Sequence, residues 1–283
     1  SRKPSSSEIR HRGPGATARA YNGRMEIFTL ESGRAPLLVS LPHDGSHIPD
    51  ALAARMTPAA RTAPDTDWFV SRLYAFAREL GASILRPNHS RYVVDLNRPP
   101  DDVSLYPGLN TTGLCPSVRF TGEPVYLPGQ EPDAAEVAAR VERYWRPYHD
   151  ALADELTRLR ARFGRALLWD GHSIRGELPF LFEGRLPDLN LGTASGTSCT
   201  PALQARLASV LASQTRYSHV INGRFKGGYI TRHYGNPARG VEAIQLELAQ
   251  STYMDEGTAS YLPERAERLE RIVLRPLLEA ALG

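Results

Sequence analysis

Short apolar runs alternate along most of this chain with longer segments in which apolar residues recur at helical spacing. Such alternation is typical of α/β folds, in which strands of one sheet are joined by helices that cover its faces. We therefore predict an α/β fold with a mixed, largely parallel sheet flanked by helices. The predicted strands cover residues 26–30, 36–41, 83–86, 92–96, 166–170, 219–222 and 241–248, and the predicted helices cover residues 67–80, 133–163, 201–215 and 263–281.

Two segments qualify this simple alternation. The predicted helix at residues 133–163 contains Pro147, which lacks a backbone donor and should kink or divide the helix. Residues 99–132 are dominated by Pro, Gly, Thr and Asn and show little period of either kind. Long loops in compact enzymes are often functional, so we expect this one to lie near a site.

Length and composition favour one globular domain. The chain has 283 residues, of which 41% are hydrophobic and 23% charged, and α/β enzymes of this size often form one compact unit. Residues 1–24 differ from the rest, since they are rich in Ser, Gly and Pro and carry six Lys or Arg side chains against one Glu. We predict a flexible basic leader at residues 1–24 and a single α/β domain at residues 25–283.

Charge and hydropathy narrow the classes of partner. The formal net charge of +3 comes from the leader, so the predicted domain has no basic excess and nucleic acid is not expected as a partner. No run approaches the roughly 18 to 20 apolar residues of a membrane-spanning helix, and we expect a soluble, cytoplasmic protein with no membrane partner. Cys115 and Cys199 lack the spacing of a thiolate zinc site and are read as incidental, and the oligomeric state stays open.

Polar side chains follow four of the predicted strands. His43 and Asp44 come after the second, Asn97-Arg98 after the fourth, Asp170 and His172 after the fifth, and Glu247 near the end of the last. Ligands of open α/β sheets bind beyond the carboxyl ends of the strands, so these side chains are expected to meet at one edge of the sheet.

The histidines favour a hydrolytic metal site. A mononuclear zinc site of this kind takes three His or carboxylate ligands and keeps one position open for water. His43 and His172, each in a glycine-containing turn after a strand, can supply two imidazoles. Asp67, Asp44 and Asp170 are candidates for the carboxylate, and Asp67 is preferred because it opens a predicted helix at the same end of the sheet. Taken singly, each has a plainer interpretation, as a structural histidine or a helix cap.

Glu247 and three arginines complete the candidate residues. Glu247 lies in an otherwise apolar strand, where a carboxylate needs a metal, an arginine or water as a partner, although a buried structural ion pair would serve equally. Arg91, Arg98 and Arg232 suit the binding of a substrate that carries carboxylates, because guanidinium groups bind carboxylates through two parallel hydrogen bonds. Pairing with Asp95, Asp101 or Asp102 is the structural alternative.

Six motifs taken together resemble the N-formylglutamate amidohydrolase family. The resemblance spans residue 25 to the C-terminus, with the motifs in the family's order. They are Leu-Val-Ser-Leu-Pro-His-Asp-Gly-Ser-His-Ile-Pro (38–49), Asp-Thr-Asp-Trp (65–68), Ser-Arg-Tyr-Val-Val-Asp-Leu-Asn-Arg (90–98), Asp-Gly-His-Ser (170–173), Gly-Gly-Tyr-Ile-Thr-Arg-His-Tyr-Gly (227–235) and Gln-Leu-Glu-Leu (245–248).

The resemblance implies an activity and a role for each candidate. It implies zinc-dependent, or other divalent-metal-dependent, hydrolysis of N-formylglutamate to formate and L-glutamate, the last step of a histidine degradation route. The implied roles are metal ligation by His43, Asp67 and His172, general base for Glu247, oxyanion stabilisation by Arg91, and binding of the substrate's carboxylates by Asn97, Arg98 and Arg232.

The family is similar in fold to the zinc carboxypeptidases, whose functional residues have the same chain order. One position departs from their pattern, because they place an acidic ligand three residues after the first histidine, where this chain has Ser46. The acidic ligand is therefore the open point, with Asp67 preferred over Asp44.

Three other functions compete with this reading. A different zinc amidase or carboxypeptidase, acting on N-acyl amino acids or peptides, would need the same metal, Glu and Arg. A binding module with a carboxylate pocket and no catalysis would leave Glu247 in an apolar strand unexplained. A phosphate-handling enzyme is disfavoured because the chain has no P-loop sequence, and the pair Gly227-Gly228 alone is weak evidence.

Overall fold

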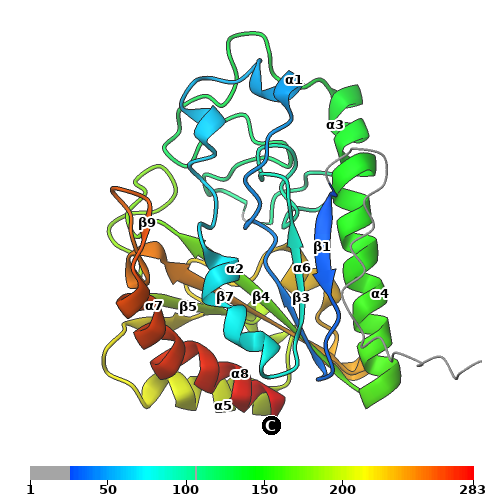
Figure 1. Ribbon diagram of the computed structural model, residues 1–283, viewed down its shortest axis with the longest axis vertical. Helices are drawn as coiled ribbons and strands as arrows, with labels where there is room; N and C mark the ends of the chain where they lie inside the picture. The colour runs from blue at the N-terminus through cyan, green and yellow to red at the C-terminus, as the bar shows by residue number, and fades with distance from the viewer. Residues whose placement is uncertain (1–25, 106) are drawn as a thin grey trace, which may run out of the picture.

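The computed structural model describes residues 26–105 and 107–283, which are organised around a seven-stranded mixed sheet (Figure 1). The predicted leader, residues 1–24, lies outside the described residues. The strand order is β1-β3-β2-β4-β7-β5-β6. The strands are β1 (Phe28–Glu31), β2 (Leu37–Ser40), β3 (Ser83–Pro87), β4 (Ala166–Ile174), β5 (Leu189–Gly192), β6 (His219–Ile221) and β7 (Val241–Ala249).

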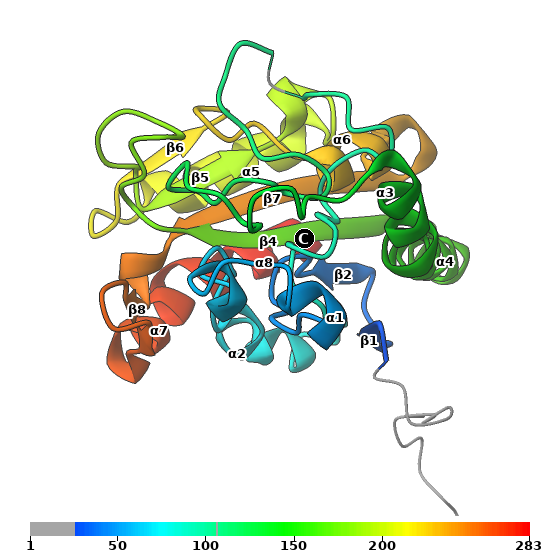
Figure 2. The same cartoon turned by 90° about the horizontal axis from the view of Figure 1, so that it is seen from above.

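The sheet is parallel in its centre and antiparallel toward its edges. Strands β3, β2, β4 and β7 run parallel to one another, β1 pairs antiparallel with β3, and β5 pairs antiparallel with β7. Figure 2 shows β4 and β7 side by side through the middle of the molecule. The predicted mixed, largely parallel α/β sheet is confirmed. A separate hairpin joins β8 (Met254–Asp255) and β9 (Ser260–Tyr261).

The helices pack on both faces of the sheet. One face is covered by α2 (Val70–Leu73), α5 (Pro201–Ala212), α7 (Pro263–Leu269) and α8 (Arg275–Leu282), and the other by α3 (Ala134–Arg140), α4 (Arg146–Phe163) and α6 (Tyr229–Tyr234). Figure 1 shows α5, α7 and α8 gathered far from α4. The short α1 (Asp50–Ala53) contributes Leu52 to the core cluster that α3 and α4 cover. Within the described ranges, no helix is long and apolar enough to cross a membrane.

One face of the two central strands changes from apolar to polar along its length. Because side chains alternate between faces, every second residue of a strand shares a face. In β4, Ala166 and Leu168 pack in the apolar core under α4, and the next two residues on that face are Asp170 and His172. In β7, Val241 and Ala243 are likewise followed by Gln245 and Glu247. The register aligns Asp170 with Gln245 and His172 with Glu247, so the four polar side chains form one patch.

The segment at residues 92–96 is a turn and not the predicted strand. Its apolar side chains are buried in the core, which explains why they mimic a strand in the sequence. The backbone instead folds on itself, since Val93 N–H donates to the Ser90 carbonyl and Asn97 N–H donates to the Asp95 carboxylate. The apolar pattern at residues 92–96 therefore predicted burial correctly and a strand conformation wrongly.

The other differences concern the ends of elements and one missed strand. The predicted helix at residues 67–80 is reduced to α2 and a 3₁₀ turn (Ala75–Arg78), so Asp67 lies ahead of α2 and does not open a helix. Strand β4 runs on to Ile174, which places His172 inside a strand and not in the expected turn after it. Strand β5 was not predicted.

Each of the two longest predicted helices is divided before a proline. A π turn (Val141–Trp145) separates α3 from α4, which carries Pro147 as its second residue. A second π turn (Glu270–Leu274) separates α7 from α8, which likewise carries Pro276 second. Proline cannot donate the helical hydrogen bond, and a wider turn accommodates its ring. The predicted division at Pro147 is thus confirmed.

Candidate functional site

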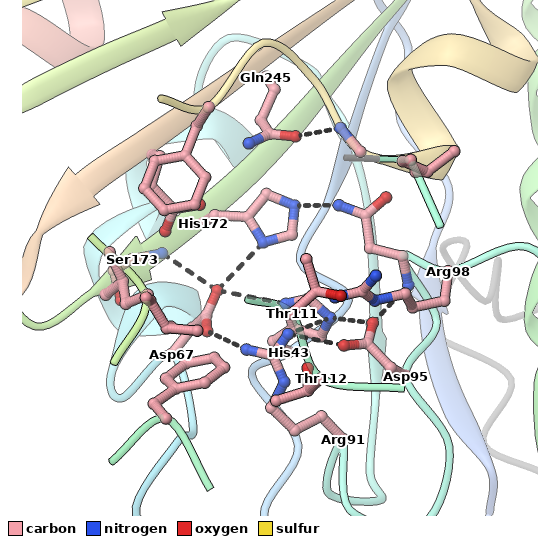
Figure 3. A pocket seen from close by; sticks show the side chains of 18 of the residues that line it. His43, Asp67, Arg91, Asp95, Arg98, Thr111, Thr112, His172, Ser173 and Gln245 are labelled. Atoms are coloured by element: carbon pink, nitrogen blue, oxygen red, sulfur yellow. Dashed lines mark hydrogen bonds and ion pairs between the residues drawn. The ribbon is translucent and has the colours of Figure 1, made fainter. Parts of the chain in front are cut away.

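Three buried side chains from separate segments meet at the polar patch (Figure 3). His43 lies just after β2, Asp67 lies between β2 and α2, and His172 projects from β4. The Asp67 Oδ2 atom is 3.7 Å from His43 Nδ1 and 3.2 Å from His172 Nδ1, and one ligand atom from each residue lies within 4.8 Å of the others. The three candidates predicted as metal ligands are therefore brought together.

Backbone hydrogen bonds hold Asp67 at this point. The Asp67 N–H donates to the His43 carbonyl at 3.0 Å, which fixes the two loop segments side by side. The Ser173 N–H donates to Asp67 Oδ2 at 3.0 Å, which ties the carboxylate to β4. Backbone groups of three segments thus position the ligand set.

The outer nitrogen of each imidazole faces a second carboxylate. His43 Nε2 is 2.7 Å from Asp95 Oδ1, and His172 Nε2 is 3.1 Å from Asp170 Oδ1. Carboxylates in such positions fix the orientation of a ligating imidazole and raise its basicity. His43 can therefore present Nδ1 toward Asp67 while Asp95 holds its Nε2, and the Nε2 of His172 lies between Asp170 and the Asn97 amide.

Burial and close charges perturb the pKa values of the cluster in opposite directions. Burial alone would raise the pKa of Asp67, but hydrogen bonds from His172 and His43 outweigh it and hold that pKa well below the usual range. Burial would lower the pKa of His172, but Asp170 and Asp67 raise it well above 6.5. Burial raises the pKa of Glu247 to about 8, and the charge of Asp67 adds to this rise, while His172 opposes it.

The donor set fits a divalent transition metal. Two imidazole nitrogens and a carboxylate oxygen are the ligands that zinc takes in hydrolytic sites. Two further carboxylates, those of Asp95 and Asp170, lie beside the ligands and are almost fully buried, and Arg91 pairs with the first of them. Since burying uncompensated charges is costly, a cation bound among these carboxylates would relieve their repulsion.

The two alternative acidic ligands lie elsewhere. Asp44 accepts a hydrogen bond from Ser71 N–H at 2.9 Å and lies 3.5 Å from Arg86, so its carboxylate binds the α2 segment. Asp170 faces the outer nitrogen of His172 and accepts a hydrogen bond from Thr231 Oγ1 at 3.2 Å. Among the described residues, the ligand cluster contains Asp67 and neither alternative.

The cluster lies at the bottom of a cavity of about 100 Å³. Glu247 lines this cavity from β7, one strand away from His172, and Gln245 lines it two residues earlier on the same face. Thr111 and Thr112, from the long loop at residues 99–132, also line it and lie near His43 in Figure 3, so this loop lies at the site as the sequence led us to expect.

Asn97 is held rigidly beside His172. Its Oδ1 accepts a hydrogen bond from Ile230 N–H at 2.8 Å, and its Nδ2 is 2.9 Å from His172 Nε2. Position 228, which lies against the Asn97 amide, must be glycine, since a Cβ there would lie only 2.4 Å from Asn97 Nδ2. The Gly228 N–H meanwhile donates to Gln245 Oε1 at 2.7 Å.

The predicted arginines differ in position. Arg91 pairs with Asp95 at 2.7 Å, lies 3.7 Å from Asp67 and packs 4.6 Å above the ring of Phe120, so it is bound within the cluster. Arg98 lines the cavity. Arg232 is not among the described residues that line the cavity, and its Nε donates to the Gly227 carbonyl.

Sequence reasoning missed several residues that line the cavity. Gln245 could have been found, because it is polar and two residues before Glu247 in an apolar strand. Arg224, Thr111 and Thr112 lie in loops that carry no periodic signal, and only the folding of those loops over the sheet brings them to the cavity.

Comparison with known proteins agrees with this geometry. The model of the N-formylglutamate amidohydrolase family matches residues 35–254, which include all three clustered ligands and Glu247. The chain belongs to this family. It is 55% identical over 259 residues to the N-formylglutamate deformylase of Pseudomonas aeruginosa, with 91% of this chain and 97% of that protein covered. It is 52% identical over 258 residues to that of Pseudomonas putida, with 91% and 96% covered.

Solved structures show the same architecture. The crystal structure of N-formylglutamate amidohydrolase from Ralstonia eutropha has a TM-score of 0.77 at 27% identity, covering 91% of this chain and 98% of that one. A gene product of Agrobacterium tumefaciens has a TM-score of 0.66 at 18% identity, covering 90% and 96%. The second likeness concerns the fold alone. The family predicted from the six motifs is confirmed.

Proposed function

We propose that this amidohydrolase is a zinc-dependent deformylase that hydrolyses N-formyl-L-glutamate to formate and L-glutamate, the last step of a histidine degradation route. The observation that carries the proposal is the buried His43, Asp67 and His172 cluster with Glu247 beside it, in a chain whose curated relatives are N-formylglutamate deformylases. Since these residues come from β2, β4, β7 and the loop before α2, we also propose that residues 25–283 act as one catalytic domain.

His43, Asp67 and His172 would hold the metal ion. When bound, zinc would act as a Lewis acid and lower the pKa of a water molecule toward neutrality. Asp95 and Asp170 would hold the two imidazoles in the orientation that presents Nδ1 to the ion, because each carboxylate lies behind the outer nitrogen.

Glu247 would be the general base and then the general acid. It is buried on the same face as His172, and its raised pKa, about 8, suits a group that must both take and return a proton near neutral pH. Its carboxylate would accept the proton of the attacking water and deliver it to the departing amide nitrogen as the C–N bond breaks. The products are formate and the free amine of L-glutamate.

The arginines and Asn97 would bind the charged parts of the substrate. The guanidinium of Arg91, fixed by Asp95, would stabilise the oxyanion of the tetrahedral intermediate, and a donor of this kind typically lowers the barrier by about 3 kcal/mol. Asn97 and Arg98 would bind the carboxylate next to the scissile amide. Arg232 is not among the described residues that line the cavity, and we assign it the support of the Gly227 loop in place of the predicted substrate contact.

The deciding experiment combines metal analysis with product release. The purified protein is expected to contain close to one divalent ion per chain and to release formate from N-formylglutamate. Formate release should stop after dialysis against a chelator and return on addition of zinc. N-acetylglutamate and a glutamate-terminated dipeptide test the main alternative, another zinc amidase or carboxypeptidase. Faster turnover of either compound than of N-formylglutamate would refute the proposed substrate.

A further inference from the structure

The substrate of the proposed function carries two carboxylates, and only one has so far been given a partner. The formyl group is small, so recognition of N-formylglutamate must depend largely on these two charges. One carboxylate is attached next to the amide, and the other lies two methylene groups further away. A residue that recognises the distant carboxylate would decide which N-formyl amino acid is accepted.

The charges around the cavity are distributed unevenly. Among the described residues that line it, the acidic ones are Asp67, Asp95 and Glu247, all at the metal cluster. The arginines that line it are Arg91, Arg98 and Arg224. Arg91 is bound to the acidic cluster, which forms the deep end of the cavity, and Arg98 follows Asn97, whose amide contacts His172 of that cluster.

Arg224 lines the same cavity from a partly exposed loop, whereas the metal cluster is buried. It lies in the loop between β6 and α6, and its guanidinium donates to two backbone carbonyls of neighbouring loops. Its Nη2 is 3.3 Å from the Leu181 oxygen and 3.4 Å from the Asn110 oxygen. Both of these residues also line the cavity. These bonds orient the guanidinium at the edge of the cavity.

An apolar wall adjoins this guanidinium. Leu181, Phe225 and Ile174 line the cavity and belong to one small hydrophobic cluster beside it. The Arg224 guanidinium lies 5.2 Å from the centre of the Phe225 ring. The methylene groups of the substrate would pack against this wall, and the carboxylate at their end would reach the Arg224 guanidinium beside it.

We propose that Arg224 binds the side-chain carboxylate of the substrate and thereby makes the enzyme specific for N-formylglutamate. This inference rests on the proposed function for the identity of the substrate. It assigns the carboxylate near the amide to Arg98 at the deep end, the methylene groups to Leu181 and Phe225, and the distant carboxylate to Arg224 at the outer end.

The test compares two substrates that differ by one charge. Kinetics of wild type, Arg224→Gln and Arg224→Lys are measured with N-formyl-L-glutamate and with N-formyl-L-glutamine, which has the same length and no side-chain charge. Arg185→Gln is the matched control, because Arg185 precedes β5 on a nearby loop, pairs with the exposed Glu177 and does not line the cavity. Metal content and thermal unfolding are measured for each variant to confirm folding.

For Arg224→Gln, kcat/KM with N-formylglutamate is expected to fall roughly 10- to 100-fold, the effect of losing a charge-assisted hydrogen bond, mainly through KM. With N-formylglutamine it should change by no more than about threefold, because the interaction with a neutral amide is weaker. The kcat/KM of Arg224→Lys with N-formylglutamate should lie between the values for wild type and Arg224→Gln. Arg185→Gln should match wild type with both substrates. An equal loss with both substrates would mean that Arg224 only holds the loops together, and no loss with either would mean that it does not touch the substrate. Both results overturn the proposal.

A binding measurement separates this inference from the proposed function. Calorimetric titration of the metal-loaded protein with L-glutamate and L-glutamine reports recognition without turnover. If wild type releases no formate from N-formylglutamate, the proposed function fails. The proposed role of Arg224 is then still supported if wild type binds glutamate more tightly than glutamine and Arg224→Gln loses that preference. It is refuted if the preference is absent or survives the substitution.

Discussion

Replacing Asp95 with asparagine should weaken metal binding while leaving the fold intact. The carboxylate of Asp95 is buried, accepts from His43 Nε2 at 2.7 Å and pairs with Arg91 at 2.7 Å. Asparagine has the same shape, and its oxygen can still accept a hydrogen bond from the imidazole, but its NH2 group cannot accept from Arg91, so the substitution removes the charge together with the pairing to Arg91. The imidazole of His43 then becomes a weaker ligand, because no anion behind it raises its basicity.

A second effect acts in the same direction. Arg91 already lies 3.7 Å from Asp67 Oδ1, and without the charge of Asp95 its guanidinium would pair more strongly with that ligand. Substitution of groups that support metal ligands typically weakens binding by about 10- to 100-fold, or roughly 1.4 to 2.7 kcal/mol. We expect Asp95→Asn to fall in this range, since both partners of the carboxylate belong to the ligand cluster.

The assay is an equilibrium competition for zinc between the metal-free protein and a coloured chelator. Asp154→Asn, which removes the same charge from the exposed surface of α4, is the control and should bind zinc as wild type does. A dissociation constant for Asp95→Asn within twofold of wild type would refute the claim that this carboxylate supports the site. Loss of the native circular dichroism spectrum would show a structural role in place of the expected local one.

Three further predictions concern the base, the metal and the pH dependence of stability. Glu247→Gln should lower kcat by about 10²- to 10⁴-fold with unchanged zinc content, because a general base is lost and no ligand is, and full turnover would contradict the assigned role. Zinc at 100 times its dissociation constant should raise the free energy of unfolding by about 2.7 kcal/mol, measured by urea titration, and an unchanged midpoint would refute a specific site in the folded state. Burial lowers the pKa of His149 to about 3, so between pH 6.5 and 3 this imidazole binds a proton in the unfolded chain and stays neutral in the folded protein. The free energy of unfolding should therefore decrease by up to about 1.4 kcal/mol per pH unit as the pH falls from 6.5 toward 3, and His149→Gln should show a shallower decrease between pH 6.5 and 4.5. Equal slopes for the two proteins would show that His149 does not contribute.

Local patterns in the sequence correctly predicted several elements because the relevant forces act over a few residues. The spacing of apolar residues indicates which side of a strand or helix is buried, and this placed six of the seven sheet strands close to their observed bounds. The proline at position 147 removes a hydrogen bond wherever the helix packs, so the division before α4 could be predicted from that residue alone.

The same patterns failed where burial did not imply regular structure. Residues 92–96 are as buried as a strand, but their hydrogen bonds close turns or run to loops and side chains and form no strand ladder, and a one-dimensional pattern cannot distinguish the two cases. For the site, residue chemistry predicted the ligands His43, Asp67 and His172 as a group. It named Arg232, which is not among the described residues that line the cavity, and did not name Arg224, which is.

By itself, the sequence determined the α/β class, the family and the kinds of side chain available for chemistry, because periodicity and residue type are properties of short stretches of chain. Only the tertiary structure decided which carboxylate faces the two imidazoles, which carboxylates lie behind them and which arginine lines the cavity. Those relations join residues that are far apart along the chain, and they depend on strand order, register and the packing of irregular loops. The energies that determine these relations come from the packing of the whole sheet with its helices and loops, so they cannot be predicted from any local sequence pattern.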